Sequence, residues 1–140
     1  MFDRILLATD GSEAAAAAVE MAIDLAAEND AILQVLYVAD TTSYSTVTLG
    51  GEVADVLEHE GEDVTQAVEN HAAEAGVETV GAVRQGRPWE EIVEYGETID
   101  ADVIVMGTRG ESGFAQALLG SVTDRVLRSS SIPVFVVPER

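Results

Sequence analysis

The sequence predicts an α/β domain built on a doubly wound, five-stranded parallel sheet with strand order 3-2-1-4-5 and four helices. Short, almost continuous apolar runs alternate along the chain with longer segments of helical periodicity. Such runs are typical of strands that are covered on both faces. The connections between them are too short to hold a second domain, so we expect residues 1–140 to form a single domain.

Five apolar runs are the expected strands. The fourth, "DVIVMG", is the most apolar, and the third, "VETVGAVRQ", alternates enough to suggest one less buried face. The last run, "IPVFVVP", is bracketed by prolines and would lie at an edge of the sheet, where an apolar strand invites pairing. The expected strands cover residues 4–9, 31–39, 77–85, 102–107 and 132–138.

The segments between these strands carry helical signals. Ser12 is placed to cap the first helix, in which Val19, Ile23 and Ala26 share one face. A long acidic helix is expected over residues 52–75, and Pro88 suits the first turn of a helix over 89–99. The last helix is expected over 118–128. In such a fold, ligands bind outside the carboxyl ends of the strands where the strand order reverses, here at Thr9–Asp10 and Met106–Gly107.

Charge is the unusual feature of the composition. The chain carries 26 acidic residues against seven arginines and no lysine, for a net charge of −19. Mutual repulsion on this scale destabilises a compact fold in dilute buffer, and concentrated salt screens it. We therefore hypothesise a protein from an organism with a high-salt cytoplasm, the alternative being an acidic surface that serves solubility alone. Duplex nucleic acid and anionic membranes would be repelled, so neither is an expected partner.

Several classes of protein are disfavoured by what the sequence lacks. It has no cysteine and no run of 18 apolar residues, and it begins without a basic segment followed by a long apolar stretch. His59 and His71 lie twelve residues apart on the acidic helix, a spacing that does not suit a shared metal site. We expect a cytoplasmic protein with no metal centre formed by its own side chains.

The segment after the fourth strand contains three glycines in the pattern Gly107-x2-Gly110-x9-Gly120-Ser121. Glycines allow positive φ and close approach of an anion, and the start of the following helix supplies amides and partial positive charge. Ser121 and Thr123 add hydroxyl donors. The spacing matches neither the P-loop nor the compact dinucleotide fingerprint, so on spacing alone a structural turn and a phosphate site both remain open.

Three segments together resemble the universal stress protein family: "ILLATDGSEAA", "VIVMGTRGESG" and "LLGSVTDRVLRSSSIPVFVV". The resemblance extends over essentially the whole chain and is weakest in the middle third. Within that family, the glycine pattern marks the branch that binds nucleotides. The resemblance therefore implies that this chain binds ATP or AMP, with Mg²⁺ held mainly by the phosphates and water.

The family's site is carried over to matching positions. Ala8, Thr9 and Asp10 correspond to positions that flank adenine and ribose, although many relatives have proline where Ala8 stands. The Val38 backbone matches the position that contacts adenine, and Met106 and Gly107 match the positions under the ribose. Arg109 is either a phosphate partner or an exposed surface charge. The positions implied to surround the phosphates are Gly110, Gly120, Ser121, Val122 and Thr123.

The resemblance also implies a homodimer in which the strands Val134–Val137 pair across a two-fold axis. The leading interpretation is a dimeric stress-response module in which ATP orders residues 108–119, with at most weak ATP hydrolysis because no catalytic constellation is visible. The alternative is an interaction module of the same fold that binds no nucleotide. An adenylate-forming enzyme is suggested by the faint resemblance of "TDGSEAA" to the glycine loop of ATP pyrophosphatases, but it is disfavoured because the second glycine is missing and the sequence shows no substrate domain.

The high-salt hypothesis predicts a chain that loses stability as salt is withdrawn. We expect the thermal midpoint, followed by circular dichroism, to fall as sodium chloride drops below about 0.5 M, where charge screening weakens. A midpoint that is unchanged between that concentration and dilute buffer would support the simple acidic surface instead.

Overall fold

The computed structural model describes residues 1–42, 51–109 and 119–139 of the chain. It contains five strands, all paired in parallel, in the order β3-β2-β1-β4-β5. The predicted doubly wound fold and its strand order are therefore confirmed. The strands are β1 Arg4–Ala8, β2 Ile32–Asp40, β3 Thr79–Gly86, β4 Val103–Gly107 and β5 Val134–Val137.

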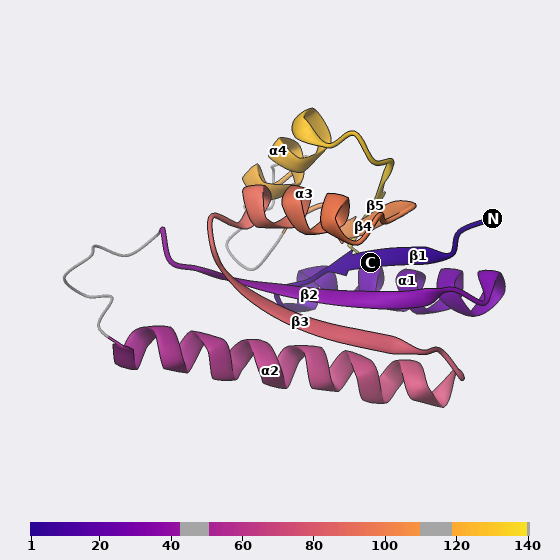
Figure 1. Cartoon of the computed structure of the whole chain (residues 1–140), viewed down its shortest axis with the longest axis horizontal. Helices are drawn as coiled ribbons and strands as arrows, with labels where there is room; N and C mark the ends of the chain where they lie inside the picture. The colour runs from indigo at the N-terminus through magenta and orange to yellow at the C-terminus, as the bar shows by residue number, and fades with distance from the viewer. Residues whose placement is uncertain (43–50, 110–118, 140) are drawn as a thin grey trace.

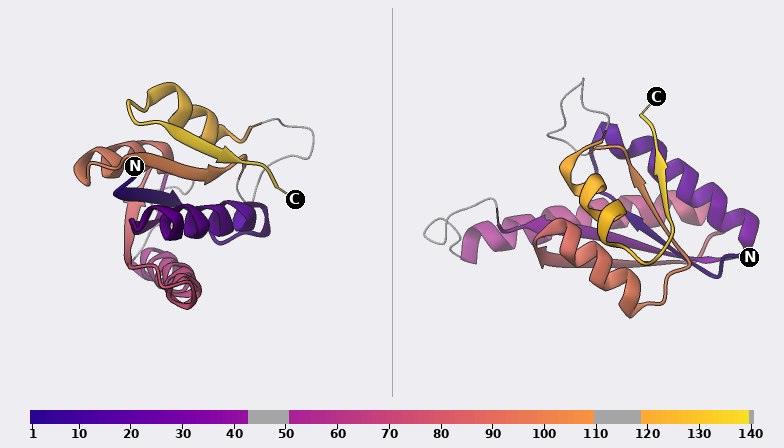
Figure 2. Two further views of the ribbon diagram at one scale, coloured as in Figure 1. Left: turned by 90° about the vertical axis from the view of Figure 1, so that its right-hand side faces the viewer. Right: turned by 90° about the horizontal axis from the view of Figure 1, so that it is seen from above.

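Four α-helices cover the two faces of this sheet (Figure 1). They are α1 Ala16–Asn29, α2 Gly51–Glu74, α3 Pro88–Thr98 and α4 Ser121–Ser129. Figure 2 shows α1 and α2 on one side of the sheet and α3 and α4 on the other. None of the helices in the described part of the chain combines the length and apolar character that crossing a membrane requires.

Each face of the sheet has its own apolar core, because successive side chains of a strand point to opposite faces. Ile5 and Leu7 of β1 face the core beneath α1 and α2, where α1 contributes Ala22 and Ile23. Leu6 faces the second core, beneath α3 and α4. All three of these β1 side chains are completely buried, as expected for the central strand of a doubly wound sheet.

One carboxylate joins the starts of β1 and β4 by hydrogen bonds. Asp102, immediately before β4, accepts hydrogen bonds from the backbone N–H groups of Asp3 at 2.7 Å and Arg4 at 3.0 Å. The bonds from Arg4 and then Asp3 lower the pKa of Asp102, because they favour its ionised form. Since β1 and β4 are both five residues long, their carboxyl ends also lie at the same edge.

Two helix starts differ from the sequence-based expectation. A 3₁₀ turn at Glu13–Ala15 precedes α1, so this helix begins at Ala16, and Ser12 makes no capping hydrogen bond with its side chain. The last helix begins at Ser121, and Leu119 and Gly120 precede it, whereas Leu118 lies outside the described residues. The final strand is also shorter than predicted, at Val134–Val137, because a proline on either side cannot donate to the ladder.

Candidate functional site

The strand order reverses at β1 and β4, so the site predicted there belongs at the carboxyl ends of these two strands. These strands are neighbours, with Leu7 opposite Val105, but the helices that follow them in the chain diverge. After β1 the chain turns into α1 on one face, and α4, which follows the loop after β4, lies on the other (Figure 2). The edge of the sheet at Ala8 and Gly107 therefore lies between helices of opposite faces, which is the general position of ligands in such folds.

The apolar site residues predicted from the family resemblance meet in one cluster. Ala8 and Met106 are buried members of the core beneath α3 and α4, and Val38 and Val122 pack against the same core while partly buried. They come from β1, β4, β2 and α4 respectively. The four residues therefore share one apolar core, at the carboxyl edge of the sheet.

The turn after β1 is fixed by its own side chains. The Thr9 N–H donates to the Leu36 carbonyl at 3.1 Å, which extends the pairing with β2 by one residue. The Thr9 Oγ1 atom accepts from the Gly11 N–H at 3.2 Å, and the Asp10 Oδ1 atom accepts from the Ser12 N–H at 3.0 Å. Such bonds preset a turn before any ligand arrives.

The beginning of α4 lies beside the end of β4. The Gly120 N–H donates to the Thr108 carbonyl at 2.6 Å, and the first bond of the helical ladder runs from the Asp124 N–H to the Gly120 carbonyl at 3.0 Å. The N–H groups of Ser121, Val122 and Thr123 therefore precede that ladder and have no acceptor within the helix. These three amides and the helix dipole make the start of α4 electropositive.

A buried hydrogen bond ties this helix end to β4. The Thr123 hydroxyl donates to the Gly107 carbonyl at 2.8 Å, and the Thr123 side chain is almost completely buried. Leaving a buried carbonyl without its donor costs about 1–3 kcal/mol, so this contact holds α4 firmly against the strand. The Thr123 hydroxyl, predicted to be a donor near the phosphates, thus positions the start of α4 against β4.

Arg109 and Gly120 lie in contact with each other. A Cβ atom on Gly120 would stand 3.0 Å from the Arg109 Cα atom, so the absent side chain permits close backbone packing. The Arg109 guanidinium forms an ion pair with Glu139, which follows β5. The two roles predicted for Arg109, a phosphate partner or an exposed surface charge, both stay predictions.

Asp124, an acidic residue in the first turn of α4, accepts a hydrogen bond from the Arg128 Nε atom at 2.9 Å. Gly110 and Glu111 lie outside the described residues. Within the described part of the chain, no group of three His, Asp or Glu side chains is arranged to hold a metal ion.

Sequence reasoning did not predict that the turn after β1 packs against α2 at Gly11. Gly11 has φ +78°, and a Cβ atom there would lie 2.7 Å from a methyl group of Val64 on α2. The Asp-Gly-Ser sequence after the first strand was a visible turn signal. No local pattern, however, indicates that this turn packs against a helix some fifty residues further along the chain.

These features define a class of structure. It is a doubly wound α/β domain with an electropositive helix end at the point where the strand order reverses. The universal stress protein family model matches residues 1–138, and the chain belongs to this family. Universal stress protein MJ0531 of Methanocaldococcus jannaschii is 36% identical over 140 residues, covering 98% of this chain and 82% of its own length.

Two solved structures extend the comparison. That of MJ0577, from the same archaeon, superposes with a TM-score of 0.86 at 28% identity and covers 100% of this chain and 98% of its own. A universal stress protein solved in complex with cAMP has a TM-score of 0.75 at 25% identity, covering 99% of this chain and 98% of its own. The family predicted from the sequence is confirmed.

Proposed function

We propose that this chain is an adenine-nucleotide-binding stress-response module that takes ATP, together with Mg²⁺, at the carboxyl edge of its sheet. The observation that supports this most directly is the start of α4, where the amides of Ser121, Val122 and Thr123 lie outside the helical ladder beside the end of β4. Backbone amides at a helix start are a recurrent phosphate site, and they need no lysine. This chain contains no lysine.

The base and the sugar would lie along the apolar wall formed by Ala8, Val38 and Met106. Adenine would pack against these side chains and meet the backbone of Val38, as the family resemblance implies. Asp10 would accept hydrogen bonds from the ribose hydroxyls, and Gly107 would lie under the sugar, where a Cβ atom would stand only 3.4 Å from the backbone oxygens of Ala14 and Arg109.

The phosphates would meet an otherwise acidic protein at its least acidic part. Residues 1–103 carry 23 acidic residues and three arginines, whereas residues 104–140 carry three acidic residues and four arginines. Repulsion of a triphosphate is therefore weakest where α4 begins. Mg²⁺ held by the phosphates and water would reduce the repulsion further. The structure solved with cAMP shows that one relative in this fold binds an adenine nucleotide.

Nucleotide binding would act on the junction between the glycine loop and α4. Thr108 and Gly120 are joined by a backbone hydrogen bond, and Arg109 is paired with Glu139 next to the last strand. A triphosphate at this junction would compete with Glu139 for the guanidinium, because both are anions. This competition would couple the nucleotide state to the end of β5 and gives the proposed switch a physical basis.

The proposed dimer would form at the edge of the sheet made by β5. Phe135 on this strand is 40% exposed, and Leu127 on the neighbouring helix α4 is also 40% exposed. An apolar edge strand with unpaired backbone groups favours pairing with a second copy of itself.

Substitutions at Ser121 test the phosphate site. Ser121→Pro removes one amide at a helix position that tolerates proline, and the preceding Gly120, with φ −70° and ψ 162°, already has the extended backbone that proline requires. Ser121→Asp adds a carboxylate that favours the helix start but repels phosphate. We expect each to weaken ATP binding about tenfold in calorimetric titration, Ser121→Pro by the loss of one charge-assisted hydrogen bond and Ser121→Asp by repulsion between its carboxylate and the phosphates.

Ser121→Ala is the matched control, because it keeps the amide and should change ATP affinity much less than Ser121→Pro. Equal ATP affinity in the wild type, the proline variant and the aspartate variant would place the nucleotide elsewhere. Absence of ATP binding by the folded wild type would favour the interaction module that binds no nucleotide.

The dimer is tested by replacing Phe135 with Glu. The wild type is expected to show twice the single-chain mass in light scattering, and Phe135→Glu is expected to shift it to the single-chain mass by placing a charge at the apolar edge. Val80→Glu is the control, since Val80 is 43% exposed on β3 at the opposite edge. A wild type with a concentration-independent single-chain mass rules the dimer out.

A further inference from the structure

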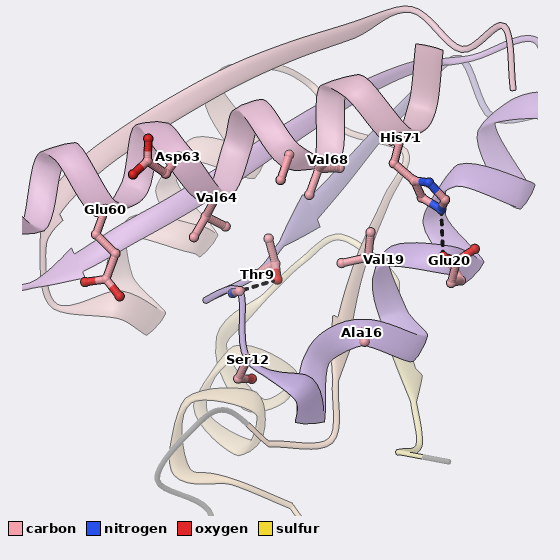
Figure 3. Close-up of a pocket in the computed structure, with 12 residues that line it drawn as sticks. Thr9, Ser12, Ala16, Val19, Glu20, Glu60, Asp63, Val64, Val68 and His71 are labelled. Carbon is pink, nitrogen blue, oxygen red and sulfur yellow. Dashed lines mark hydrogen bonds and ion pairs between the residues drawn. The ribbon is translucent and has the colours of Figure 1, made fainter. Parts of the chain in front are cut away.

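A groove of about 500 Å³ separates α1 from α2 over part of their length (Figure 3). Val19 of α1 and Val64 and Val68 of α2 line its middle. Ala16 and Ala67 also line it, and their small side chains leave the space between the two helices unfilled. A side chain that bridges this groove therefore contributes more to the connection between α1 and α2 than it would across a filled interface.

One pair of side chains bridges the groove in the last turn of α2. Figure 3 shows His71 of α2 pointing toward Glu20 of α1, and the His71 Nε2 atom lies 2.7 Å from the Glu20 Oε1 atom. Among the side chains that the structure describes, this is the only hydrogen bond or ion pair between the two helices. The polar connection of α1 to α2 therefore depends on one histidine.

The other ring nitrogen of His71 also faces a carboxylate. The Nδ1 atom lies 3.4 Å from the Glu74 Oε2 atom, which belongs to the same helix. An ionised carboxylate only accepts hydrogen bonds, and a neutral imidazole has one N–H donor whereas an imidazolium has two. Because both nitrogens face carboxylates, the arrangement fits the protonated ring better than the neutral one.

The charge around this pair is acidic. The sequence contains no arginine or lysine between Arg4 and Arg84, so His59 and His71 are the only side chains of α1 and α2 that can become positive. Every other charged side chain of these two helices is a carboxylate, and like charges on neighbouring helices repel each other. A proton on His71 therefore reduces the repulsion at the point where the two helices are joined.

The charged groups that face His71 are Glu20 from α1 and Glu74 from its own helix. The hydrogen bond and the charge of Glu20, followed by those of Glu74, raise the pKa of His71 above its ordinary value of 6.5, while desolvation opposes them. Because the pKa is higher in the folded chain, the stabilisation is fully present below pH 6.5 and is lost as the pH rises through the raised pKa.

From this geometry we propose that His71 and Glu20 form a pH-dependent clasp between α1 and α2, which is closed when the imidazole is protonated and weakened when it is neutral. In the closed state the imidazolium pairs with Glu20 across the groove and with Glu74 on its own helix. Loss of the proton to solvent removes one donor and the positive charge, so the two acidic helices separate more often at this end of the groove. The clasp does not depend on nucleotide binding.

The titration of His71 tests the contact on which the clasp depends. Imidazole C–H resonances of the full chain, followed by NMR between about pH 5.5 and about pH 9, give its midpoint, and His71→Gln assigns the signal. Glu20→Gln is expected to lower this midpoint. Glu28→Gln, the same change of charge two turns further along α1, should lower it much less. Equal shifts would show that His71 senses only the general negative charge, and would overturn the proposal.

A double-mutant cycle tests whether the proton fastens the helices. His71→Gln retains a neutral donor and so represents the deprotonated ring. Wild type, His71→Gln, Glu20→Gln and the double variant are compared by thermal melting, in the lowest salt that keeps the chain folded. We expect a coupling of about 2 °C in the thermal midpoint at about pH 6, as for an exposed ion pair, and none at about pH 9. Equal coupling at both pH values, or none at either, would contradict the clasp.

His59→Gln is the matched control for this cycle. His59 lies on the same helix and forms no hydrogen bond or ion pair with another side chain that the structure describes. It should therefore show no coupling to Glu20→Gln at either pH. Coupling as large as that of His71 would assign the effect to the overall charge of α2 and overturn the proposal.

Discussion

The parallel pairing of β1 with both β2 and β4 is the constraint on which the rest of the structure depends. Leu7 lies opposite Val35 on one side and Val105 on the other, at the centre of the sheet. Because strand order reverses here, α1 and α4 cover opposite faces. The same pairing brings Ala8 and Gly107 to one edge, where the Thr123 hydroxyl fixes the start of α4. The position of the proposed nucleotide site thus follows from the strand order more than from individual side chains.

The distribution of charge sets α4 apart from the other helices. The layer of α1 and α2 carries acidic side chains and no arginine or lysine, whereas Arg125 and Arg128 lie on α4. Arg125 stacks over the Trp89 ring, with its guanidinium carbon 5.1 Å from the ring centroid, so part of this positive charge is held on the surface of the α3–α4 layer. Since α3 carries Glu90, Glu91, Glu94 and Glu97, the positive charge belongs to α4 and not to the whole layer, and the proposed phosphate site lies at the start of this helix.

Continuous apolar runs predicted the buried strands well, because burial on both faces leaves a simple sequence pattern. The expected fourth strand at 102–107 is observed as Val103–Gly107, and the central position of the first strand was also correct in the predicted order. The shared cluster of Ala8, Val38 and Met106 could be predicted only by combining strand order with the family resemblance. Elements defined by their own periodicity were therefore accessible from sequence.

Features that depend on tertiary contacts could not be predicted from the sequence. Ser12 has the residue type of a helix cap, but Asp10 holds its N–H in a tight turn and the α-helix starts later. The ion pair between Arg109 and Glu139 joins residues thirty positions apart, and nothing in either local sequence indicates it. The turn at Gly11 likewise packs against Val64 of α2, a contact between residues far apart in the sequence. Predictions for Gly110 lie outside the described residues.

The central claim is that an adenine nucleotide occupies the carboxyl edge with its phosphates at the start of α4. Amide hydrogen exchange, measured residue by residue with and without Mg²⁺ and ATP, tests it most directly. The account predicts that ATP slows exchange at the Ser121, Val122 and Thr123 amides, which have no acceptor within the helix, and leaves the middle of α2 unchanged. Saturating ATP that leaves these three amides unprotected, or that protects only residues of α1 and α2, would contradict it.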